Sequence, residues 1–346
     1  MNDKNYMAAY AAVAKGKIEK VTIPIPEPDD YEVLVKNEGC VFCNTTDRMI
    51  VDDLYATPAY PVLFGHESFG RVIKLGKKVT KYKLGDRVIC TNAIVNRYDG
   101  TYYASWGGFA EYGIAGDLDA YLADYGQLDE ENRYRGRYFA NSIIPSDFSY
   151  EKAALVFPLA ETASAAKQVG DLEGKTVVVL GAGTAGASIV YFAKAYGASL
   201  VVCINRSETK LRAATKLGAD ATFTDMTEAS AYILQNGGAD VVFECTGAWQ
   251  ILENGLPYLK EGGILAVYAR TKKPYAFDLL KGPSSFRYQA INPRVPEALE
   301  DVCRLLRADK IPMEVFLSHM WGFEQVPEAF EEVRKGNVMK GLVVIS

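Results

Sequence analysis

The sequence predicts an α/β protein with two domains, a compact β barrel followed by a doubly wound parallel sheet. Its 346 residues are 49% hydrophobic, which is enough for two sizeable cores. Up to about residue 115, short strand-like segments alternate with Gly, Pro and Asp turns, as in a barrel or sandwich. From about residue 150, wholly apolar strands alternate with helical segments, which is typical of a parallel sheet covered on both faces.

The barrel is expected to begin with the apolar segment 7–14, which we interpret as a strand. Asp3 and Lys4 precede it, and this weak charge pattern does not fit a secretory signal. Further strands are expected at 21–26, 31–39, 70–76, 86–90 and 109–115. The stretch 116–141 is rich in tyrosine and charge, and we expect a partly helical excursion on the barrel surface.

The parallel sheet is expected to use five apolar or mixed segments, each bounded by Gly, Asp or polar residues. These are 176–180, 200–204, 240–245, 263–268 and 286–291. A helix is predicted over 296–310, and the tail 323–346 is predicted to add a further amphipathic helix and a strand.

Composition excludes several classes of function. A net charge of -5 gives no general attraction for nucleic acid, and no run of 18 apolar residues is present to span a membrane. The six cysteines are scattered, which does not fit a disulfide framework and indicates a reducing, cytoplasmic setting. We therefore expect a small-molecule partner rather than nucleic acid or membrane.

A glycine-rich loop follows the first strand of the predicted parallel sheet. Gly181, Gly183 and Gly186 form G-x-G-x-x-G, with Thr184 and Ala185 inside it, directly before a predicted helix. This context favours a dinucleotide whose pyrophosphate meets the helix N-terminus. A purely structural turn is one alternative.

An S-adenosylmethionine-dependent methyltransferase is another alternative for this loop. Such enzymes usually carry an acidic residue two or three positions before the first glycine, where this chain has Val178 and Val179. They also lack a preceding β domain of this type, so we disfavour this class.

The end of the second strand favours NADP over NAD. Asn205, Arg206 and Ser207 stand where an NAD enzyme would place Asp or Glu. A carboxylate would repel a 2′-phosphate, whereas an amide, a guanidinium and a hydroxyl can bind it. Asn205 could still accept a ribose hydroxyl, and Lys210 either assists or is solvated.

The ends of the next two strands are expected to contact the coenzyme as well, because parallel sheets bind ligands at their carboxyl edge. The residues there are Thr246, Gly247, Tyr268 and Ala269.

Three side chains offer donors for a metal ion. His66 is one of only two histidines, and the carboxylate of Glu67 follows it directly. Together with the thiol of Cys43 they supply the imidazole, oxygen and sulfur donors that zinc accepts. A lone structural histidine is the alternative unless these side chains converge.

Several motifs resemble those of the zinc-dependent medium-chain alcohol and polyol dehydrogenases, over nearly the whole chain. They are CVFCNTTD, GHESFGRV, LGDRV, GGFAEY, the glycine loop with NRS, DVVFECTG and AFEEVRKGNVMKGLVV. The resemblance implies a GroES-like β-barrel catalytic domain over 1–150, a Rossmann coenzyme domain over 151–293, and a return to the barrel over 294–346. It also implies one catalytic zinc, which stabilises the alkoxide of the substrate during hydride transfer.

The resemblance assigns Cys43 and His66 as zinc ligands, and Glu67 as a carboxylate beside the metal that binds it directly in some members. The family has a further ligand where this chain has Phe157. Glu161 follows four residues later and would share the helix face, so it could replace that ligand or contact the substrate. Otherwise the site uses Cys43, His66, Glu67 and water.

The proton relay of the family is altered here. Thr45 matches the hydroxyl that takes the alcohol proton, whereas Thr46 stands at the family aspartate and Asp47 is displaced by one. A relay histidine aligns with Arg48, which could relay through water, bind an anionic group or be a surface arginine. Lys340 matches a basic residue near the coenzyme pyrophosphate, or is an ordinary exposed lysine.

The remaining cysteines and histidine are interpreted as structural. TNAIVNRYDGTYYASWGG lacks the four cysteines that hold a second, structural zinc in many members, so none is expected. The residues expected to be structural are Cys40, Cys203, Cys245, Cys303 and His319.

The leading hypothesis is a cytoplasmic, zinc-dependent and NADP-preferring dehydrogenase for a secondary alcohol and its ketone, with a polyol or sugar derivative as substrate. The resemblance implies a homodimer or homotetramer. A metal-free reductase of activated alkenes or quinones, and a non-enzymatic cofactor-binding protein, are the competing hypotheses.

Overall fold

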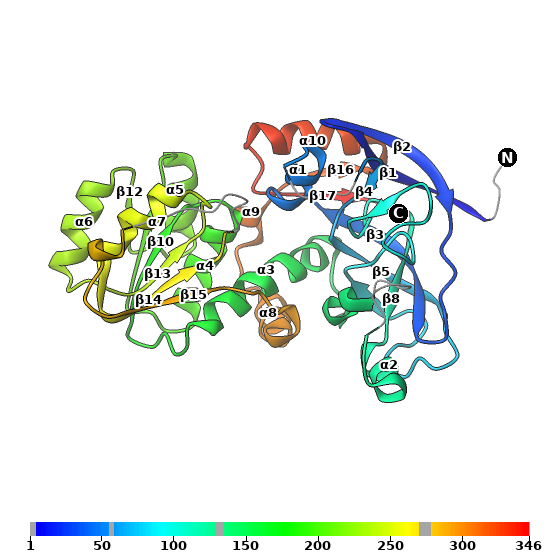
Figure 1. The fold of residues 1–346 in the computed structure, drawn as a ribbon, viewed down its shortest axis with the longest axis horizontal. Coiled ribbons are helices and arrows are strands. Elements are labelled where there is room, and N and C mark those ends of the chain that lie inside the picture. Colours follow the sequence, from blue (N-terminus) through cyan, green and yellow to red (C-terminus); the bar gives the residue numbers. More distant parts are fainter. Residues whose placement is uncertain (1–4, 55–58, 129–134, 270–277, 346) are drawn as a thin grey trace. The chain divides into compact units, whose positions relative to one another are not determined.

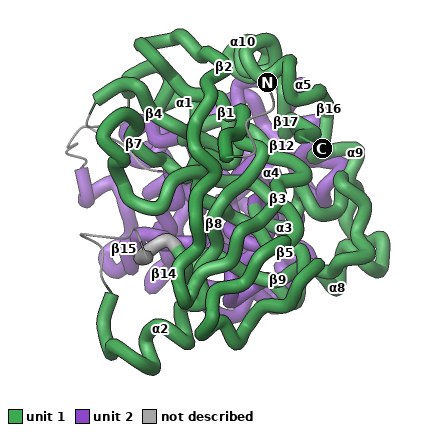
Figure 2. Tube along the Cα trace, turned by 90° about the vertical axis from the view of Figure 1, so that its right-hand side faces the viewer, with its two compact units in different colours: residues 1–157, 299–346 green, residues 158–298 purple. Residues whose placement is uncertain are grey.

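The computed structural model describes residues 5–54, 59–128, 135–269 and 278–345 (Figure 1). The chain divides into two compact units, residues 1–157 with 299–346 and residues 158–298 (Figure 2). The second unit is therefore an insertion in the first. The sequence placed these boundaries at 150 and 293, a few residues earlier in each case.

The first unit contains a seven-stranded sheet in the order β16-β17-β3-β5-β6-β9, with β8 paired to β3. β17 lies antiparallel to β3, so the C-terminal segment joins the sheet made by the first part of the chain. The strands are β3 (Glu32–Val41), β5 (Glu67–Leu75), β6 (Arg87–Ile89), β8 (Tyr112–Gly116), β9 (Ser142–Ile144), β16 (Leu317–Gly322) and β17 (Lys340–Val344).

A second sheet of this unit has the order β2-β1-β4-β7. Its strands are β1 (Tyr6–Ala14), β2 (Lys17–Pro24), β4 (Val62–Leu63) and β7 (Tyr103–Ala104), so the apolar segment 7–14 is a strand, as expected. The main core of the unit includes fully buried aromatic rings, because both sheets and the helix α10 (Val326–Lys335) direct apolar side chains inward. These rings are Phe42, Phe64, Phe109 and Phe330.

Short helices complete the first unit. They are α1 (Thr46–Val51), α2 (Leu118–Tyr125), η1 (Arg135–Ala140), α8 (Leu299–Arg307), α9 (Met313–Phe316), η5 (Phe323–Gln325) and α10 (Val326–Lys335). α10 has a proline in its first turn and ends at Gly336, whose φ of 80° suits a left-handed helix end. α3 (Tyr150–Gln168) begins in this unit and continues into the second.

The tyrosine-rich excursion is helical in part, as predicted, although 129–134 lie outside the described residues. Asp117 caps α2 by accepting from the backbone N–H of Ala120 at 3.1 Å. Its other oxygen accepts from the N–H groups of Thr80 and Lys81, each at 2.8 Å. Asp117 is fully buried. Through these hydrogen bonds, its carboxylate joins the excursion to the loop after β5.

Replacing Asp117 with alanine is expected to lower the free energy of unfolding by about 2–4 kcal/mol, because three backbone N–H groups lose a charged acceptor. Burial alone would raise the pKa of Asp117, but the hydrogen bonds from Lys81, Thr80 and Ala120 outweigh it and lower the pKa. A lowered pKa means that the stabilisation is present above the unfolded-state value of about 4 and is lost as the pH falls through the folded-state value. Urea unfolding at pH 7 and below pH 4 measures both effects.

The exposed neighbour Asp119 provides the control, and Asp119→Ala should unfold like the unmodified protein. A difference between Asp117→Ala and the unmodified protein that stayed constant down to the lowest pH would contradict this account.

The second unit is a six-stranded parallel sheet in the order β12-β11-β10-β13-β14-β15. In chain order this is 3-2-1-4-5-6, the Rossmann arrangement. The strands are β10 (Thr176–Leu180), β11 (Leu200–Ile204), β12 (Ala221–Phe223), β13 (Ala239–Glu244), β14 (Leu259–Val267) and β15 (Phe286–Ala290). The predicted α/β class with a doubly wound sheet is therefore confirmed.

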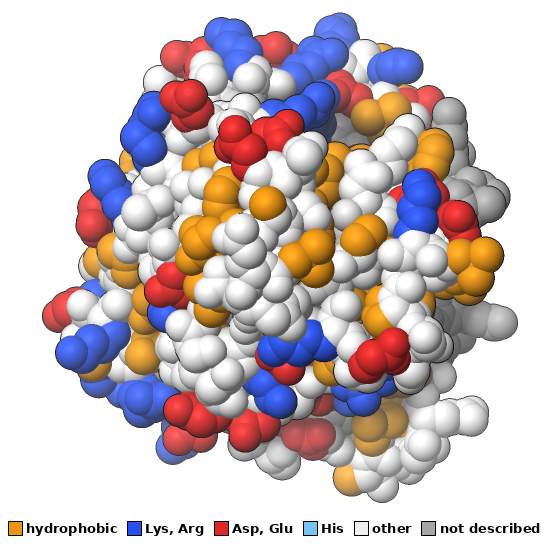
Figure 3. All heavy atoms as spheres, turned by 90° about the vertical axis from the view of Figure 1, so that its left-hand side faces the viewer, with side chains coloured by type: hydrophobic (Ala, Val, Ile, Leu, Met, Phe, Trp, Pro, Cys, Tyr) orange, Lys and Arg blue, Asp and Glu red, His pale blue; other side chains and the backbone are white. Residues whose placement is uncertain are grey.

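Helices alternate with these strands (Figure 1). They are α4 (Thr184–Ala195), α5 (Glu208–Lys216), α6 (Met226–Gln235), α7 (Trp249–Gly255), η2 (Leu256–Tyr258), η3 (Leu279–Lys281) and η4 (Val295–Glu297). Among the described residues, none of the helices combines the length and the apolar character needed to cross a bilayer. Acidic and basic side chains are interspersed on the face drawn in Figure 3.

Candidate metal centre and coenzyme loop

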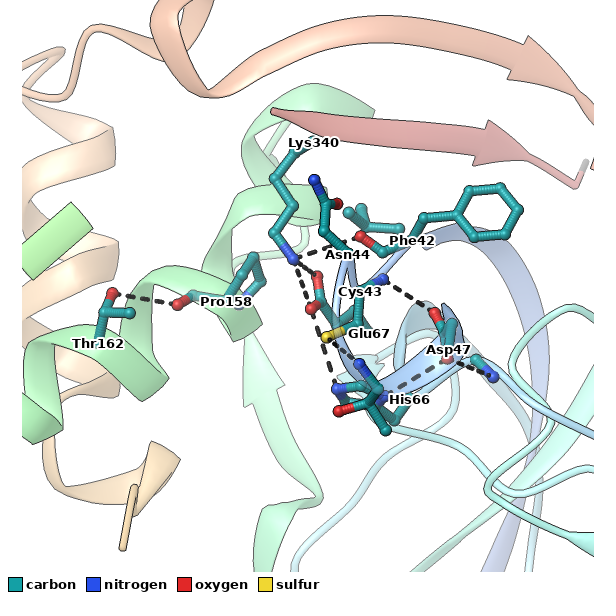
Figure 4. Close-up of polar contacts among 12 residues, drawn as sticks. Phe42, Cys43, Asn44, Asp47, His66, Glu67, Pro158, Thr162 and Lys340 are labelled. Carbon is teal, nitrogen blue, oxygen red and sulfur yellow. Dashed lines mark hydrogen bonds and ion pairs between the residues drawn. The ribbon is translucent and has the colours of Figure 1, made fainter. Parts of the chain in front are cut away.

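The three predicted metal donors converge in the first unit. One donor atom each from Cys43, His66 and Glu67 lies within 4.8 Å of the other two. Figure 4 shows the three side chains gathered at one point. Among the described residues this is the only such group of three, and a thiolate, an imidazole and a carboxylate fit the donor preferences of zinc.

Pairing between β3 and β5 brings these donors together. Val41 at the end of β3 pairs with Glu67 at the start of β5, so Cys43 and His66 leave adjacent strand ends. Gly65 has a φ of 95°, and a Cβ there would lie 2.6 Å from the Phe109 ring. Only glycine allows the chain to turn into His66 at this point.

Asp47 lies beside His66 and was not among the predicted ligands. Its Oδ1 is 3.7 Å from Nδ1 of His66, and the Asp47 side chain accepts from the N–H groups of Cys43 at 2.8 Å and Gly65 at 3.2 Å. The carboxylate therefore holds both donor-bearing segments and faces the imidazole, as carboxylates behind metal-bound histidines do. The sequence signal was present, because Asp47 lies one position after the family aspartate.

Opposing effects act on the charge of His66, which is only 5% exposed. Burial lowers its pKa, but the negative charges and hydrogen-bonding groups of Cys43 and Asp47 outweigh burial and raise the pKa well above its usual value. His66 Nδ1 is buried and has no hydrogen-bond partner among the described residues. The imidazole thus faces two groups, Cys43 and Asp47, that favour its positively charged form.

Glu67 has a buried partner of opposite charge. Nζ of Lys340 lies 2.5 Å from both carboxylate oxygens, and also donates to the backbone oxygen of Phe42 at 3.4 Å. Both side chains are almost fully buried. Burial raises the pKa of Glu67 although Lys340 and His66 act in the opposite direction.

The contact of Lys340 with the coenzyme pyrophosphate remains a prediction. The alternative, an ordinary exposed lysine, is wrong, because the ammonium group is buried against Glu67. The reason is the register of β17, which pairs with β3 and so carries Lys340 to the strand end that precedes Cys43.

Two aromatic rings flank His66. The Phe157 ring lies edge-on at 5.7 Å between centroids, and the Trp106 indole lies at 4.8 Å with the planes inclined at 40°. Phe157, at the family's ligand position, is thus a ring contact of the imidazole. Glu161 is not part of the donor group and lies in the second unit, so its role as a ligand remains a prediction.

The predicted relay residues lie on or before α1. Thr45 precedes this helix, and the N–H of Thr46 donates to Sγ of Cys43 at 3.3 Å. Arg48 is half exposed and pairs with Asp52 at 3.5 Å. Relay roles for Thr45 and Arg48 remain predictions.

The glycine loop has the predicted strand-to-helix context in the second unit. Gly181 has a φ of 102°, and a Cβ on Gly186 would lie 1.8 Å from the carbonyl oxygen of Gly181. Gly183 precedes α4, which begins at Thr184 and includes Ala185. The loop therefore exposes the N-terminus of α4 as a phosphate site would require.

Asn205 closes this loop from the end of β11. Its Oδ1 accepts from the N–H of Ala182 at 3.2 Å, and its Nδ2 donates to the backbone oxygen of Ser207 at 3.4 Å. Ser207 precedes α5, Arg206 is exposed, and Lys210 is on the first turns of α5. The amide thus links the glycine loop to the residues predicted to bind the ribose.

Glu244 forms hydrogen bonds to the residues that follow β13 and β14. Sequence analysis did not predict this role for Glu244. Its carboxylate accepts from the N–H groups of Thr246 at 2.6 Å and Gly247 at 3.0 Å. Its backbone oxygen accepts from the N–H groups of Tyr268 and Ala269. The motif DVVFECTG was the available signal, and these predicted coenzyme contacts lie at the carboxyl edge of the sheet.

The other cysteines and His319, which were interpreted as structural, differ in burial. Cys40, Cys203 and Cys303 are buried, and Cys245 is partly buried. His319 stacks on Trp321 at 5.2 Å between ring centroids and is exposed.

Comparison with known proteins agrees with both halves of the structure. Residues 29–121 match the alcohol dehydrogenase GroES-like domain, and residues 185–287 match the zinc-binding dehydrogenase domain. D-xylulose reductase A of Aspergillus niger is 28% identical, with 99% of this chain and 97% of the relative covered. Sorbitol dehydrogenase 2 of Saccharomyces cerevisiae is 28% identical, with 82% of each covered.

Solved structures share the fold over almost the whole chain. Benzyl alcohol dehydrogenase from Acinetobacter calcoaceticus has a TM-score of 0.82 at 21% identity, with 99% of each chain covered. Galactitol-1-phosphate dehydrogenase from Escherichia coli has a TM-score of 0.80 at 21% identity, with 98% of this chain and 100% of the other covered. With its GroES-like and coenzyme domains, the chain belongs to the zinc-dependent medium-chain alcohol and polyol dehydrogenases and is an oxidoreductase.

Proposed function

We propose that this oxidoreductase transfers hydride between NADP(H) and a secondary alcohol and its ketone, and that the alcohol is a polyol or sugar derivative. The observation that carries the proposal is the convergence of Cys43, His66 and Glu67 within 4.8 Å. Relatives named as D-xylulose reductase and sorbitol dehydrogenase support the substrate class.

The residues of the chain have separable roles in this proposal. Cys43 and His66 hold the zinc, with Glu67 beside it, and a bound zinc would supply Lewis acidity toward the substrate oxygen. Asp47 orients the imidazole. Thr45 accepts the alcohol proton and passes its own hydroxyl proton to water. Glu161 is a further ligand or a substrate contact, and Arg48 assists the relay through water.

The coenzyme is held at the carboxyl edge of the parallel sheet. The N-terminus of α4, behind the glycine loop, meets the pyrophosphate, and Asn205, Arg206, Ser207 and Lys210 meet the 2′-phosphate. Backbone and side chains after β13 and β14 line the nicotinamide half: Thr246, Gly247, Tyr268 and Ala269.

The test is to measure zinc and activity together. Protein purified without chelators is analysed for zinc, and NADP and NAD reduction are compared with xylitol, D-sorbitol, galactitol and benzyl alcohol. We expect about one zinc per chain, as one catalytic ion requires, and turnover with NADP and at least one polyol. Absence of turnover in a zinc-loaded preparation would overturn the proposal.

A metal-free reductase is the second candidate, because the buried ion pair with Lys340 neutralises the Glu67 carboxylate without a metal ion. Full turnover of quinones or activated alkenes by chelator-treated, zinc-free protein would favour this candidate.

Asn205→Asp is expected to shift the ratio of kcat/KM for NADP over NAD toward NAD by at least about tenfold, since a carboxylate repels the 2′-phosphate. The carboxylate can still accept from the N–H of Ala182, so the glycine loop keeps that contact, whereas the hydrogen bond to the Ser207 oxygen is lost. Steady-state kinetics with both coenzymes measure the ratio. Asn236→Asp, at an exposed position in the same unit, is the matched control, and an unchanged ratio for Asn205→Asp would refute the assignment.

A further inference from the structure

Trp106 is a partly exposed aromatic residue beside one of the metal donors, His66. Its indole lies 4.8 Å from the His66 ring, centroid to centroid, and His66 is 5% exposed. Trp106 and Cys43 are both partly exposed in this region. A molecule that approaches the donors of the first unit therefore meets the indole next to the imidazole.

The backbone at Trp106 is strained. Its φ is 70°, a conformation that bulky side chains rarely adopt, and the N–H of Gly107 donates to the oxygen of Ser105 at 3.2 Å. This hydrogen bond closes a tight turn centred on Trp106, which is an unfavourable turn for an aromatic residue. Such strain persists only where the surroundings over-determine the conformation, and it concentrates at functional sites.

Hydrogen bonds on both sides of the turn hold it against the segment that leads to His66. Ser105 N–H donates to the Leu63 oxygen at 2.8 Å, and Gly108 N–H donates to the Gly65 oxygen at 2.7 Å. The Trp106 oxygen accepts from the N–H of Ala93 at 2.8 Å. These contacts set the indole and the imidazole in one rigid arrangement.

Two glycines permit this close approach. A Cβ on Gly107 would lie 2.6 Å from the Cβ of Ala93, and one on Gly108 would lie 2.6 Å from the Cβ of Ser68. Larger residues at either position would push the turn away from His66. The local sequence thus places a tryptophan beside the donor group, and the backbone at this tryptophan is strained as a result.

We propose that Trp106 determines substrate specificity, and that it favours alcohols whose reacting carbon belongs to a ring with a flat C–H face over open-chain polyols. This inference rests on the proposed function, because it requires an alcohol bound beside Cys43 and His66. The ring substrates are cyclitols and sugars in ring form.

The chemistry of the two kinds of alcohol differs at an indole face. A ring sugar offers a patch of C–H groups, which can be buried against the indole without removing hydroxyls from water. An open-chain polyol carries a hydroxyl on nearly every carbon, so the same contact leaves some hydroxyls without hydrogen-bond partners. The indole therefore discriminates between substrates of similar polarity.

The test compares Trp106→Ala and Trp106→Phe with the unmodified protein on 1,5-anhydro-D-glucitol, myo-inositol, D-sorbitol and xylitol. We expect Trp106→Ala to raise KM for the ring alcohols about tenfold and to change KM for the open-chain polyols less than about twofold, with zinc content unchanged. Trp106→Phe should keep KM for the ring alcohols close to that of the unmodified protein, because it retains an aromatic ring. Tyr98→Ala removes another exposed aromatic ring of the same segment. It should change KM neither for the ring alcohols nor for the open-chain polyols.

A uniform fall in kcat for all four alcohols, with loss of zinc, would show that Trp106 only supports His66 and would overturn the inference. So would equal changes in KM for ring and open-chain alcohols. These outcomes leave the proposed function intact.

A binding measurement tests the inference even if none of the four alcohols is turned over. The chain has three tryptophans, so Trp249→Phe with Trp321→Phe leaves Trp106 as the only one. In the zinc- and NADP-loaded double variant, 1,5-anhydro-D-glucitol should change the tryptophan emission saturably, at a concentration at least about tenfold lower than D-sorbitol. No change with either alcohol would overturn the inference.

Discussion

Cys43→Ser protein is expected to lose its zinc and to retain less than about a thousandth of the activity, because a weakly acidic hydroxyl cannot replace the thiolate among the donors. Of the remaining donors, Glu67 is paired with Lys340 and His66 is flanked by two aromatic rings. Neither ring, Phe157 or Trp106, can bind a metal. The measurement is zinc per chain after dialysis, together with kcat/KM for the best polyol.

Cys40→Ala is the matched control for this prediction. Cys40 is a buried thiol on β3, three residues before Cys43, but it is not among the three converging donors. This variant should keep its zinc and its activity while losing some stability. Full zinc content and activity in Cys43→Ser protein would exclude the proposed metal centre.

Lys340→Met is expected to lower the free energy of unfolding of the zinc-free protein by about 3–5 kcal/mol, because it leaves the Glu67 carboxylate buried without its counter-ion. Zinc should offset much of this loss, since the freed carboxylate can turn to the cation. The variant should therefore gain more stability from zinc than the unmodified protein does. Urea unfolding with a chelator and with saturating zinc measures how much zinc stabilises each of the two proteins.

Lys340→Arg retains a positive charge and serves as the control. Its free energy of unfolding in the zinc-free state should fall less than that of Lys340→Met. Competition against a chromophoric chelator gives the zinc affinity independently of activity. If zinc stabilised Lys340→Met and the unmodified protein equally, Glu67 would have no part in holding the metal.

The donors of the metal centre could be predicted because they lie in short motifs. Cys43 lies shortly after one predicted strand, and the pair His66–Glu67 lies shortly before another, so pairing of these two strands is enough to bring them together. The glycine loop is likewise a local feature, in which Gly186 is needed because its Cβ would meet the oxygen of Gly181.

Lys340 could not be assigned in the same way, because its partner Glu67 is separated from it by most of the chain. The contact depends on the register between β17 and β3, which has no local signature in the sequence. Asp47 illustrates a smaller difficulty, since a helix that begins at Thr46 turns a displaced aspartate back toward His66. Trp106 was passed over because nothing in the sequence indicated its left-handed backbone.

The insertion of residues 158–298 within the first unit has a consequence for synthesis on the ribosome. The parallel sheet can be completed while the barrel still lacks β17, and β17 is translated after every other strand. Until then the nascent barrel holds an acidic side chain whose cationic partner has not been made. A free divalent cation in the cell could occupy that position first, so the order of translation would let metal loading precede closure of the barrel.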